Sequence, residues 1–451
     1  MKKLLAVLLA LVLAVGLLAG CGGAASSTAP ASSAPAASSA PAANDPTQMT
    51  AEITWWAFPT FAQNDGAPAG TYEQEVIAAF NEKYPNIKVN LETIDFTSGP
   101  DAITAAIEGN AAPDVLFDAP GRIIEYGKNG KLASLDDLFT ADFVADVNND
   151  ALIGACKGDG VAYMYPISTA PFYMSINKAM WEDAGAMQYV NLEGDRTWKT
   201  EDFEKAIQAL KDKGYNPGTL FCQNQGGDQG TRAFISNLYG ATIANADKTE
   251  YTMNSEAGIK GLETAQKWIQ EGLLGNGVAY NGGGDIELYV AGTTSYALCW
   301  GAATQKAQQA TLDTNKIETI SLPFPSDDGV PSLEYLVNGF CVFNNGDDNK
   351  IAASKEFIKF VCDDATWGPK NVVQTGSFPV RTSFGDLYAG NEEMALLSGW
   401  TKYYGPYYNT MNGFANMRAE WWNMLQAITN GADVTEAVNT YVTNSNAGMK
   451  A

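Results

Sequence analysis

Histidine is absent from the 451-residue chain. Because histidine is the commonest general base and the commonest metal ligand near neutral pH, this excludes Ser-His-Asp catalysis, Cys-His catalysis and histidine-based zinc sites. Cysteine is also scarce: besides Cys21 there are five residues, widely separated and without a C-x-x-C pair. Such spacing is typical of neither a disulfide framework nor a zinc site. We expect no metal and no cofactor, and we expect Cys299 and Cys341, which lie in apolar runs, to be buried free thiols.

Basic residues are few. The chain has 28 lysines and arginines against 51 aspartates and glutamates, a formal net charge of −23. A surface so acidic repels nucleic acids and anionic lipid headgroups, so neither is an expected partner, and its simplest meaning is solubility. The glycine-rich stretch GGDQGTR (226–232) lacks the Lys-Ser/Thr of a phosphate-binding loop, which argues against a nucleotide ligand.

The N-terminus carries two lysines, an uncharged apolar run (Leu4–Ala19) and small residues directly before Cys21. This is the pattern of a secretory signal peptide (1–20), and the run is shorter than the roughly 20 residues that span a bilayer. The cysteine at the cleavage point resembles the lipobox of bacterial lipoproteins. That resemblance implies that Cys21 is acylated with diacylglycerol and anchors the mature chain to the membrane. The alternative is an uncleaved membrane helix with an incidental cysteine.

Residues 21–50 are rich in alanine, serine and proline and nearly free of charge. A segment without large apolar residues has nothing with which to drive folding. We expect a flexible tether that lifts a folded body off the membrane.

The remaining chain is long enough for two domains. Predicted strands at 53–58, 87–91 and 115–117 alternate with predicted helices at 72–84 and 101–109. This order implies a parallel sheet with right-handed crossovers. In open sheets of this type, ligands bind beyond the carboxyl ends of the strands, where Phe58, Thr60, Asp118 and Arg122 lie in the sequence.

Three later segments are predicted to cross between two lobes. Strands at 162–167 and 172–177 are separated by the small residues Ser168–Pro171, and further crossings are expected at 329–338 and 378–381. Apolar residues at helical spacing predict further helices, at 200–213, 257–270, 350–362 and 413–428.

Four segments together resemble a known family: FNEKYPNIKV, AAIEGNAAPDVLFD, YPI…INKAMWEDAG and the EAVN-type C-terminal end. They are similar to the family 1 extracellular solute-binding proteins that deliver carbohydrates to ABC importers, the group containing the maltodextrin-binding proteins. The resemblance covers nearly all of Glu52–Ala451. It implies an α/β, two-lobed periplasmic-binding-protein-like fold (type II), each lobe a mainly parallel sheet flanked by helices. Crossing hinge strands would join lobe 1 (51–168 plus 337–378) to lobe 2 (172–330 plus 381–451).

A sugar site needs flat rings for the C–H faces and paired polar groups for the hydroxyls. The ring candidates are Trp56, Phe58, Tyr173, Trp300 and Trp421. Trp300 stands where the family commonly has a stacking tryptophan, and Trp421 or Trp422 matches a second such position, although each ring could equally belong to a core. Trp55 faces away from Trp56 along the same strand and is assigned to the core.

The polar candidates are Thr60, Asp118, Arg122, Asp228, Arg232, Asn338 and Arg381. Asp118 stands where the maltodextrin branch carries a tryptophan, a departure that argues against maltose in particular. For Arg381 the alternative to ligand contact is an ion pair that fixes the hinge.

The resemblance implies a monomeric protein, lipid-anchored on the outer face of the bacterial cell membrane. It would capture a mono- or oligosaccharide by hinge closure and deliver it to the permease subunits of an ABC importer, without catalytic residues. Two alternatives stay open. One is a secreted glycan-acting hydrolase, which needs only two carboxylates about 5–9.5 Å apart. The other is a binder of another polar solute, such as a polyol.

Overall fold

The computed structural model of the protein describes residues 45–61, 67–96 and 98–450. The predicted signal peptide, Cys21 and most of the predicted tether lie outside the described residues. Within those residues, no helix combines the length and the apolar character that crossing a membrane requires.

Six strands form the largest sheet, in the order β13-β6-β12-β3-β1-β2. Their bounds are β1 (Ala51–Ala57), β2 (Ile87–Thr93), β3 (Val115–Asp118), β6 (Tyr165–Pro171), β12 (Tyr335–Val342) and β13 (Phe378–Pro379). β1 pairs in parallel with β2 and β3, which confirms the predicted strand-helix-strand opening. β12 is antiparallel to both β3 and β6, and β13 is antiparallel to β6. The sheet is therefore mixed rather than mainly parallel, because β12 and β13 run in the opposite direction to the strands beside them.

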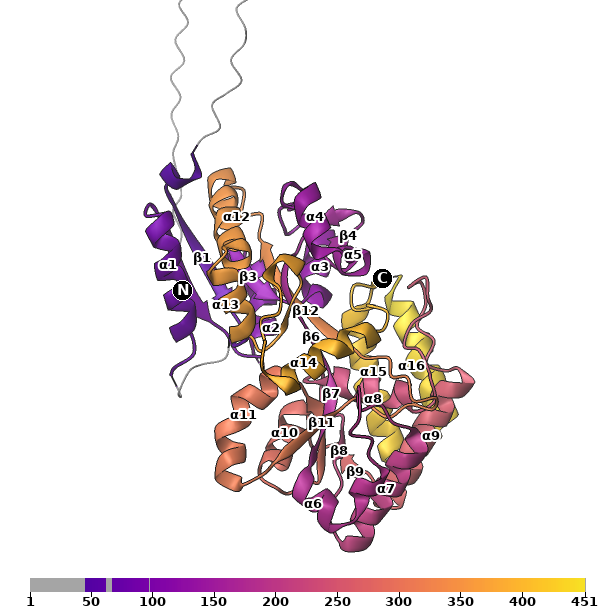
Figure 1. Ribbon diagram of the computed structural model, residues 1–451. Coiled ribbons are helices and arrows are strands. Elements are labelled where there is room, and N and C mark those ends of the chain that lie inside the picture. Colours follow the sequence, from indigo (N-terminus) through magenta and orange to yellow (C-terminus); the bar gives the residue numbers. More distant parts are fainter. Residues whose placement is uncertain (1–44, 62–66, 97, 451) are drawn as a thin grey trace, which may run out of the picture. The chain divides into compact units, whose positions relative to one another are not determined.

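Helices cover this sheet through their apolar faces. Helix α1 (Thr71–Lys83) buries Val76, Ile77 and Phe80 at helical spacing and ends before Pro85, which cannot continue a helix. Helix α12 (Asp348–Asp363) packs against both α1 and β1 (Figure 1). The remaining elements on this side are α2 (Gly99–Glu108), α3 (Pro120–Lys128), α4 (Ala141–Val147), α5 (Asp150–Ala155), α13 (Trp367–Gln374) and the short strands β4 (Lys157–Gly158) and β5 (Val161–Ala162).

A second sheet has three antiparallel strands in the order β10-β7-β11. They are β7 (Tyr173–Asn177), β10 (Tyr296–Trp300) and β11 (Thr319–Leu322). A parallel pair, β8 (Thr219–Phe221) and β9 (Gly275–Gly277), lies near it. The helices on this side are α6 (Lys178–Asp183), α7 (Thr200–Lys213), α8 (Asp228–Leu238), α9 (Glu256–Gln270), α10 (Gly282–Val290), α11 (Ala302–Asn315), α14 (Glu392–Gly399), α15 (Phe414–Thr429) and α16 (Val434–Gly448). Short 3-10 helices occupy Pro46–Gln48, Asp136–Leu138, Ala186–Tyr189, Thr382–Phe384 and Trp400–Tyr403.

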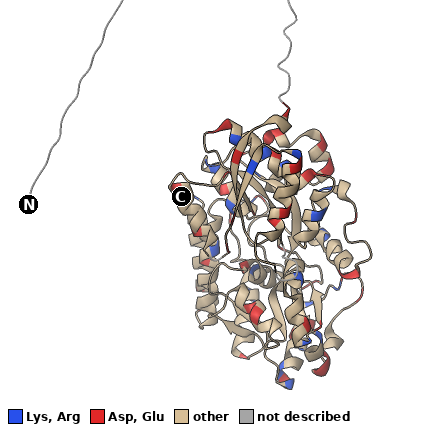
Figure 2. Cartoon of the chain, turned by 90° about the vertical axis from the view of Figure 1, so that its left-hand side faces the viewer, with Lys and Arg blue, Asp and Glu red and all other residues tan. Residues whose placement is uncertain are grey.

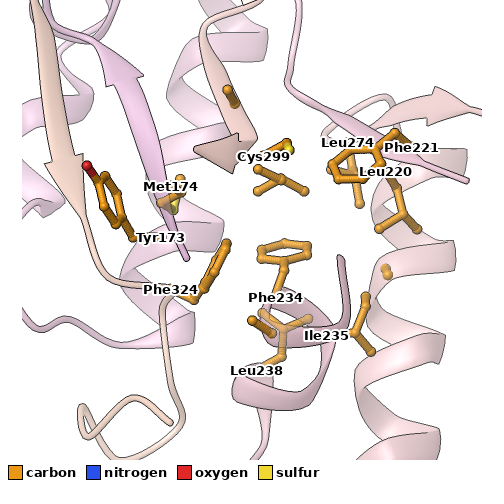
Figure 3. Packing of buried hydrophobic residues seen from close by; sticks show 14 of the residues in the cluster. Tyr173, Met174, Leu220, Phe221, Phe234, Ile235, Leu238, Leu274, Cys299 and Phe324 are labelled. Atoms are coloured by element: carbon orange, nitrogen blue, oxygen red, sulfur yellow. The ribbon is translucent and has the colours of Figure 1, made fainter. Parts of the chain in front are cut away.

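The buried apolar side chains form two separate clusters. The first core surrounds the six-stranded sheet and comes from 53–167 and 335–372, with Val380 and Tyr407. The second core comes from 173–333 and 397–442, with Phe378. Figure 3 shows part of the second core, where Phe234 of α8 lies between Met174 of β7 and Leu220 of β8. The described cysteines are buried and unpaired in these cores, as expected for Cys299 and Cys341.

The chain passes between the two cores near the predicted crossings. β6 runs on to Pro171 without a break, so the first passage falls at Phe172 rather than within Ser168–Pro171. The second passage leads from Leu333 of the second core to Tyr335 of the first, and the two passages are joined because the Phe172 N–H donates to the Glu334 carbonyl at 2.8 Å. The third runs through β13, where Phe378 belongs to the second core and Val380 to the first.

Charged residues are distributed over many elements. Figure 2 shows acidic residues on helices throughout the described chain, interspersed with basic ones rather than gathered at one place. This distribution fits the interpretation of the negative charge as solubilising.

Candidate ligand-binding site

A cavity with a volume of about 730 Å³ is lined from both cores. The first core contributes α2, the turn after β1 and the start of α3. The second core contributes the loop before α8 and the start of α15. Phe172 of the first passage also lines the cavity, together with Leu336 and Asn338 of β12. A volume between about 300 and 1,000 Å³ is usual for small-molecule sites. A smaller hollow of about 340 Å³ lies between α15 and α16, with walls from the second core alone.

Asp118 and Arg122 form an ion pair in the cavity wall. Asp118 ends the buried strand β3, and α3 begins two residues later, so one helical turn brings Arg122 back to it. Nε and Nη2 of Arg122 donate to the two carboxylate oxygens of Asp118, each at 2.6 Å. This side-on geometry uses both oxygens and orients the guanidinium. Both residues line the cavity, as the sequence predicted for the carboxyl end of this strand.

A pair of stacked phenylalanines stands beside that ion pair. Phe58 is buried, and its ring stacks on Phe96 at 4.9 Å with planes 5° apart. Arg122 lies over the Phe58 ring at 5.3 Å. Phe96 itself is 60% exposed and lines the cavity. The predicted residue Phe58 therefore does not line the cavity itself. It packs against Phe96 and Arg122, which do.

A network of buried charges holds Arg418 in the part of the wall that comes from the second core. Arg418 donates from Nε and Nη2 to the two Asp228 oxygens, each at 2.8 Å, and from Nη2 to the Gln225 carbonyl at 2.6 Å. Asp228 also accepts from Arg232, which in turn donates to both carboxylate oxygens of Glu334 at 3.0 Å. Burial alone would raise the pKa of Asp228, but Arg232 and Arg418 hold it below its usual value. Asp228 and Arg232 are thus buried structural partners of Arg418 rather than cavity walls.

Thr60 and Asn338 complete the predicted residues that reach the cavity. Thr60 lies in the tight turn after β1, where its N–H donates to the Phe58 carbonyl at 2.7 Å. Asn338 lies at an irregularity in the pairing of β12 with β6 and donates to the Ser168 hydroxyl at 3.2 Å. Such irregularities re-aim a side chain at the edge of a site.

Three of the predicted ring residues are buried in the second core. Tyr173 and Trp421 have no exposed surface, and Trp300 is 1% exposed. Trp300 packs edge-on against Tyr289 at 5.0 Å, and its indole N–H is satisfied by Gln305 at 3.2 Å. The expectation that these rings face a ligand therefore needs correction. Every residue of β7 and of β10 is buried, which includes Tyr173 and Trp300.

Two further predicted residues also lie away from the cavity. Trp56 is half-buried and packs against the first core, while Trp55 is fully buried there as expected. Arg381 is buried with its guanidinium over the rings of Phe143 and Tyr165, and it pairs with Asp363 at 2.5 Å. Its placement corresponds to the ion-pair alternative for this residue.

Several cavity residues were not predicted from the sequence. They are Phe96, Phe172, Gln225, Gln229, Asn409, Phe414 and Arg418. One signal could have identified Arg418: it is the only basic residue between Lys402 and Lys450. An isolated cation in an apolar helix of an acidic protein needs a carboxylate partner.

The cavity wall combines ring faces with polar groups. Among residues 45–61, 67–96 and 98–450, no group of three or more acidic or cysteine side chains is placed to hold a metal ion. The wall instead offers ring faces from Phe96, Phe172 and Phe414 together with fixed hydrogen-bond donors. Such a combination can bury C–H groups and pair hydroxyls at the same time.

Comparison with known proteins gives consistent results. Residues 39–366 match the family model described as bacterial extracellular solute-binding protein. The GacH receptor of Streptomyces glaucescens, solved without ligand and with acarbose, is similar with a TM-score of 0.72 at 15% identity, over 89% of this chain and 97% of that one. An ABC transporter solute-binding protein from Thermotoga lettingae, solved with alpha-D-tagatose, has a TM-score of 0.73 at 18% identity, over 89% and 100% of the two chains. At these identities the likeness shows the fold.

A curated relative matches over a shorter stretch. An uncharacterised lipoprotein of Streptomyces antibioticus is 29% identical over 114 residues, which is 25% of this chain and 25% of that protein. The matched stretch therefore spans about a quarter of that relative's length.

Proposed function

Because the chain belongs to the bacterial extracellular solute-binding proteins, we propose that it captures a mono- or oligosaccharide in the cavity between its two cores and delivers it to an ABC importer. The single observation that carries the proposal is the composition of that cavity. It combines exposed and half-buried ring faces with arginine and amide groups whose own positions are held by hydrogen bonds.

A sugar fits this wall for two physical reasons. Its C–H faces gain by covering flat rings such as Phe96. Its hydroxyls need partners, because a polar group enclosed without one costs about 1–3 kcal/mol. The solved neighbours with acarbose and alpha-D-tagatose support a carbohydrate in particular.

Capture would work by hinge closure. We assign most of the first core to a lobe made of 51–168 and 337–378, and most of the second to a lobe made of 172–330 and 381–451. Phe378 packs in the second core and Tyr407 in the first. The cavity has walls on both, so a bound sugar gains contacts when the lobes approach. The ligand shifts the equilibrium only by its preference for the closed form. The closed form then docks on the permease.

No covalent step is part of the proposal, and the sugar is released unaltered. Asp118, a carboxylate in the cavity wall, has both oxygens engaged by Arg122, which leaves it poorly placed as a general acid. Incubation with chromogenic glycosides tests this point, because release of the chromophore would reveal a hydrolase.

The proposal includes a lipid anchor at Cys21, which lies outside the described residues. The curated lipoprotein relative supports it. Labelling of cells with a fatty-acid analogue should mark the wild-type protein, whereas Cys21→Ser should leave it unlabelled and release it from the membrane fraction.

The central experiment is calorimetric titration of the soluble chain without residues 1–21. The panel contains D-glucose, D-galactose, maltose and D-tagatose, with ribitol, glycine and a dipeptide as comparisons. We expect heat and a raised melting temperature from at least one sugar. Binding of only the amino acid or the dipeptide would contradict the proposed substrate class, and binding of only ribitol would favour the polyol alternative.

A further inference from the structure

Two arginines face the cavity from opposite cores, and an aspartate holds each of them in the same way. Arg122 on the first core and Arg418 on the second each donate from Nε and Nη2 to both oxygens of one carboxylate. The aspartates themselves are almost completely enclosed: the exposed fraction of the side chain is 4% for Asp118 and 2% for Asp228. This is the strong, bidentate form of the ion pair, which fixes the plane of the guanidinium.

This bidentate ion pair, in which an aspartate clamps an arginine, determines which N–H groups of the arginine remain free to bind a ligand. An arginine carries five N–H groups. In Arg418, the Nε hydrogen and both Nη2 hydrogens are engaged, by Asp228 and by the Gln225 carbonyl. Among the described residues, no hydrogen bond leaves Nη1 of Arg418 or of Arg122. Because Arg418 lines the cavity and its side chain is 12% exposed, Nη1 is the group that it can offer to a bound molecule.

The same pairs cancel the positive charge of the wall. Asp118 neutralises Arg122, and the buried set of Arg418, Arg232, Asp228 and Glu334 sums to zero. The third cation of the cavity, Lys131, is exposed and shares the wall with three exposed acids, Asp101, Glu108 and Glu125. An anionic ligand would therefore bring an uncompensated charge into a partly enclosed space, which is costly.

We propose that Arg418 contacts the ligand, that Asp228 positions it, and that the two aspartate-clamped arginines make the cavity select uncharged over anionic carbohydrates. This inference rests on the proposed function, since it specifies the carbohydrate that the cavity accepts. The arginines act here as oriented donors to sugar oxygens rather than as net charges.

The test compares matched sugars that differ only in charge: D-glucose with D-glucuronate, and D-galactose with D-galacturonate. In the pair whose neutral sugar binds more tightly, we expect the wild-type protein to bind that neutral sugar at least tenfold more tightly than its uronate. Asp228→Asn leaves a net positive charge beside the cavity and releases Arg418. We expect it to weaken the neutral sugar about tenfold and to strengthen the uronate, so that the preference shrinks or reverses.

Asp114→Asn is the matched control. Asp114 is a buried carboxylate paired with Lys350 at 3.3 Å and bonded to the Thr54 N–H at 2.8 Å, in the first core and away from the cavity wall. It should lose stability without changing the ratio of the two affinities. If Asp228→Asn does not fold, Asp118→Asn serves instead, because its partner Arg122 is more exposed, with 28% of the side chain accessible.

A double-mutant cycle separates positioning from a purely structural role. If Asp228 acts through Arg418, then Asp228→Asn adds little further loss of neutral-sugar affinity once Arg418→Ala is present. Additive losses would overturn the positioning role. Equal wild-type affinity for neutral and uronate sugars would overturn the selectivity while leaving the proposed function intact. Failure of wild-type protein to bind any sugar of the panel would overturn both.

Discussion

Gly121 of α3 lies so close to Phe414 of α15 that a methyl group at position 121 would stand 2.7 Å from Cε1 of that ring. The contact joins the two cores, because α3 belongs to the first and Phe414 to the second. Both residues also line the cavity. The absence of a side chain at position 121 is therefore a condition for the close approach of the two walls.

The substitution Gly121→Ala should weaken sugar binding by about tenfold, equivalent to about 1.4 kcal/mol. The added methyl group would either displace the Phe414 ring or hold the two cores apart, and both changes disfavour the closed form. Calorimetric affinity and the radius of gyration at saturating sugar would measure the effect. Gly154→Ala on α5 is the control, since nothing lies within 4 Å of its Cβ position; an equal loss there would contradict the proposed contact.

Phe96→Ala should reduce sugar affinity about tenfold and leave the fold nearly unchanged. Its ring is 60% exposed, so the change in the free energy of unfolding should stay within about 0.5 kcal/mol. The lost ring face accounts for the affinity. Urea denaturation and titration with the best sugar measure the two quantities. Leu192→Ala, at a residue 46% exposed and outside the cavity wall, should change neither.

Trp300→Ala should act on stability. Its ring is buried against Tyr289, so truncation should lower the free energy of unfolding by about 3–5 kcal/mol. Trp422, which is only partly buried, provides a comparison, and Trp422→Ala should cost clearly less. If Trp300→Ala instead had the free energy of unfolding of the wild-type protein and bound sugar poorly, the ring would belong to the binding site.

Asp285 should make stability depend on pH. It is enclosed in the second core, where no lysine or arginine of the described residues pairs with it. It accepts from the Thr219 hydroxyl at 2.7 Å and from the Leu298 N–H at 2.8 Å. Burial raises its pKa to about 6 from an ordinary value of 3.8. Between these values the folded protein holds a proton that the unfolded chain has lost. Its contribution to the free energy of unfolding therefore falls as pH rises from about 4 to 6.

Asp285→Asn removes this titration. The stability of the variant relative to wild type should rise between pH 4 and 6 and then level off, as measured by urea denaturation at several pH values. Asp136→Asn should show the opposite trend at lower pH, because the Ala162 N–H and the Ser134 hydroxyl hold the pKa of Asp136 below its ordinary value of 3.8 in the folded state. The stability of this variant relative to wild type should fall as pH rises toward about 4 and then stay constant. A pH-independent difference for Asp285→Asn would show that the carboxyl does not titrate in this range.

The sequence by itself determined the local elements and the excluded chemistry. Apolar spacing located α1 and α12 to within two residues, because a helix is specified by contacts three and four positions apart. The pair of Asp118 and Arg122 could be found for the same reason: a strand end and one helical turn bring them together. The absence of histidine excludes histidine-dependent catalysis whatever fold the chain adopts, because composition does not depend on packing.

Only the tertiary structure decided which rings and charges face the cavity. Trp300 and Phe96 both lie near strand ends, yet the first is buried and the second exposed, and that outcome depends on which distant elements pack over each ring. Likewise Arg418 meets Asp228 across 190 positions of the chain. Hydrophobic burial and charge pairing depend on which residues meet in space, and they leave no regular spacing in the sequence. Such partners become visible only when both cores are assembled.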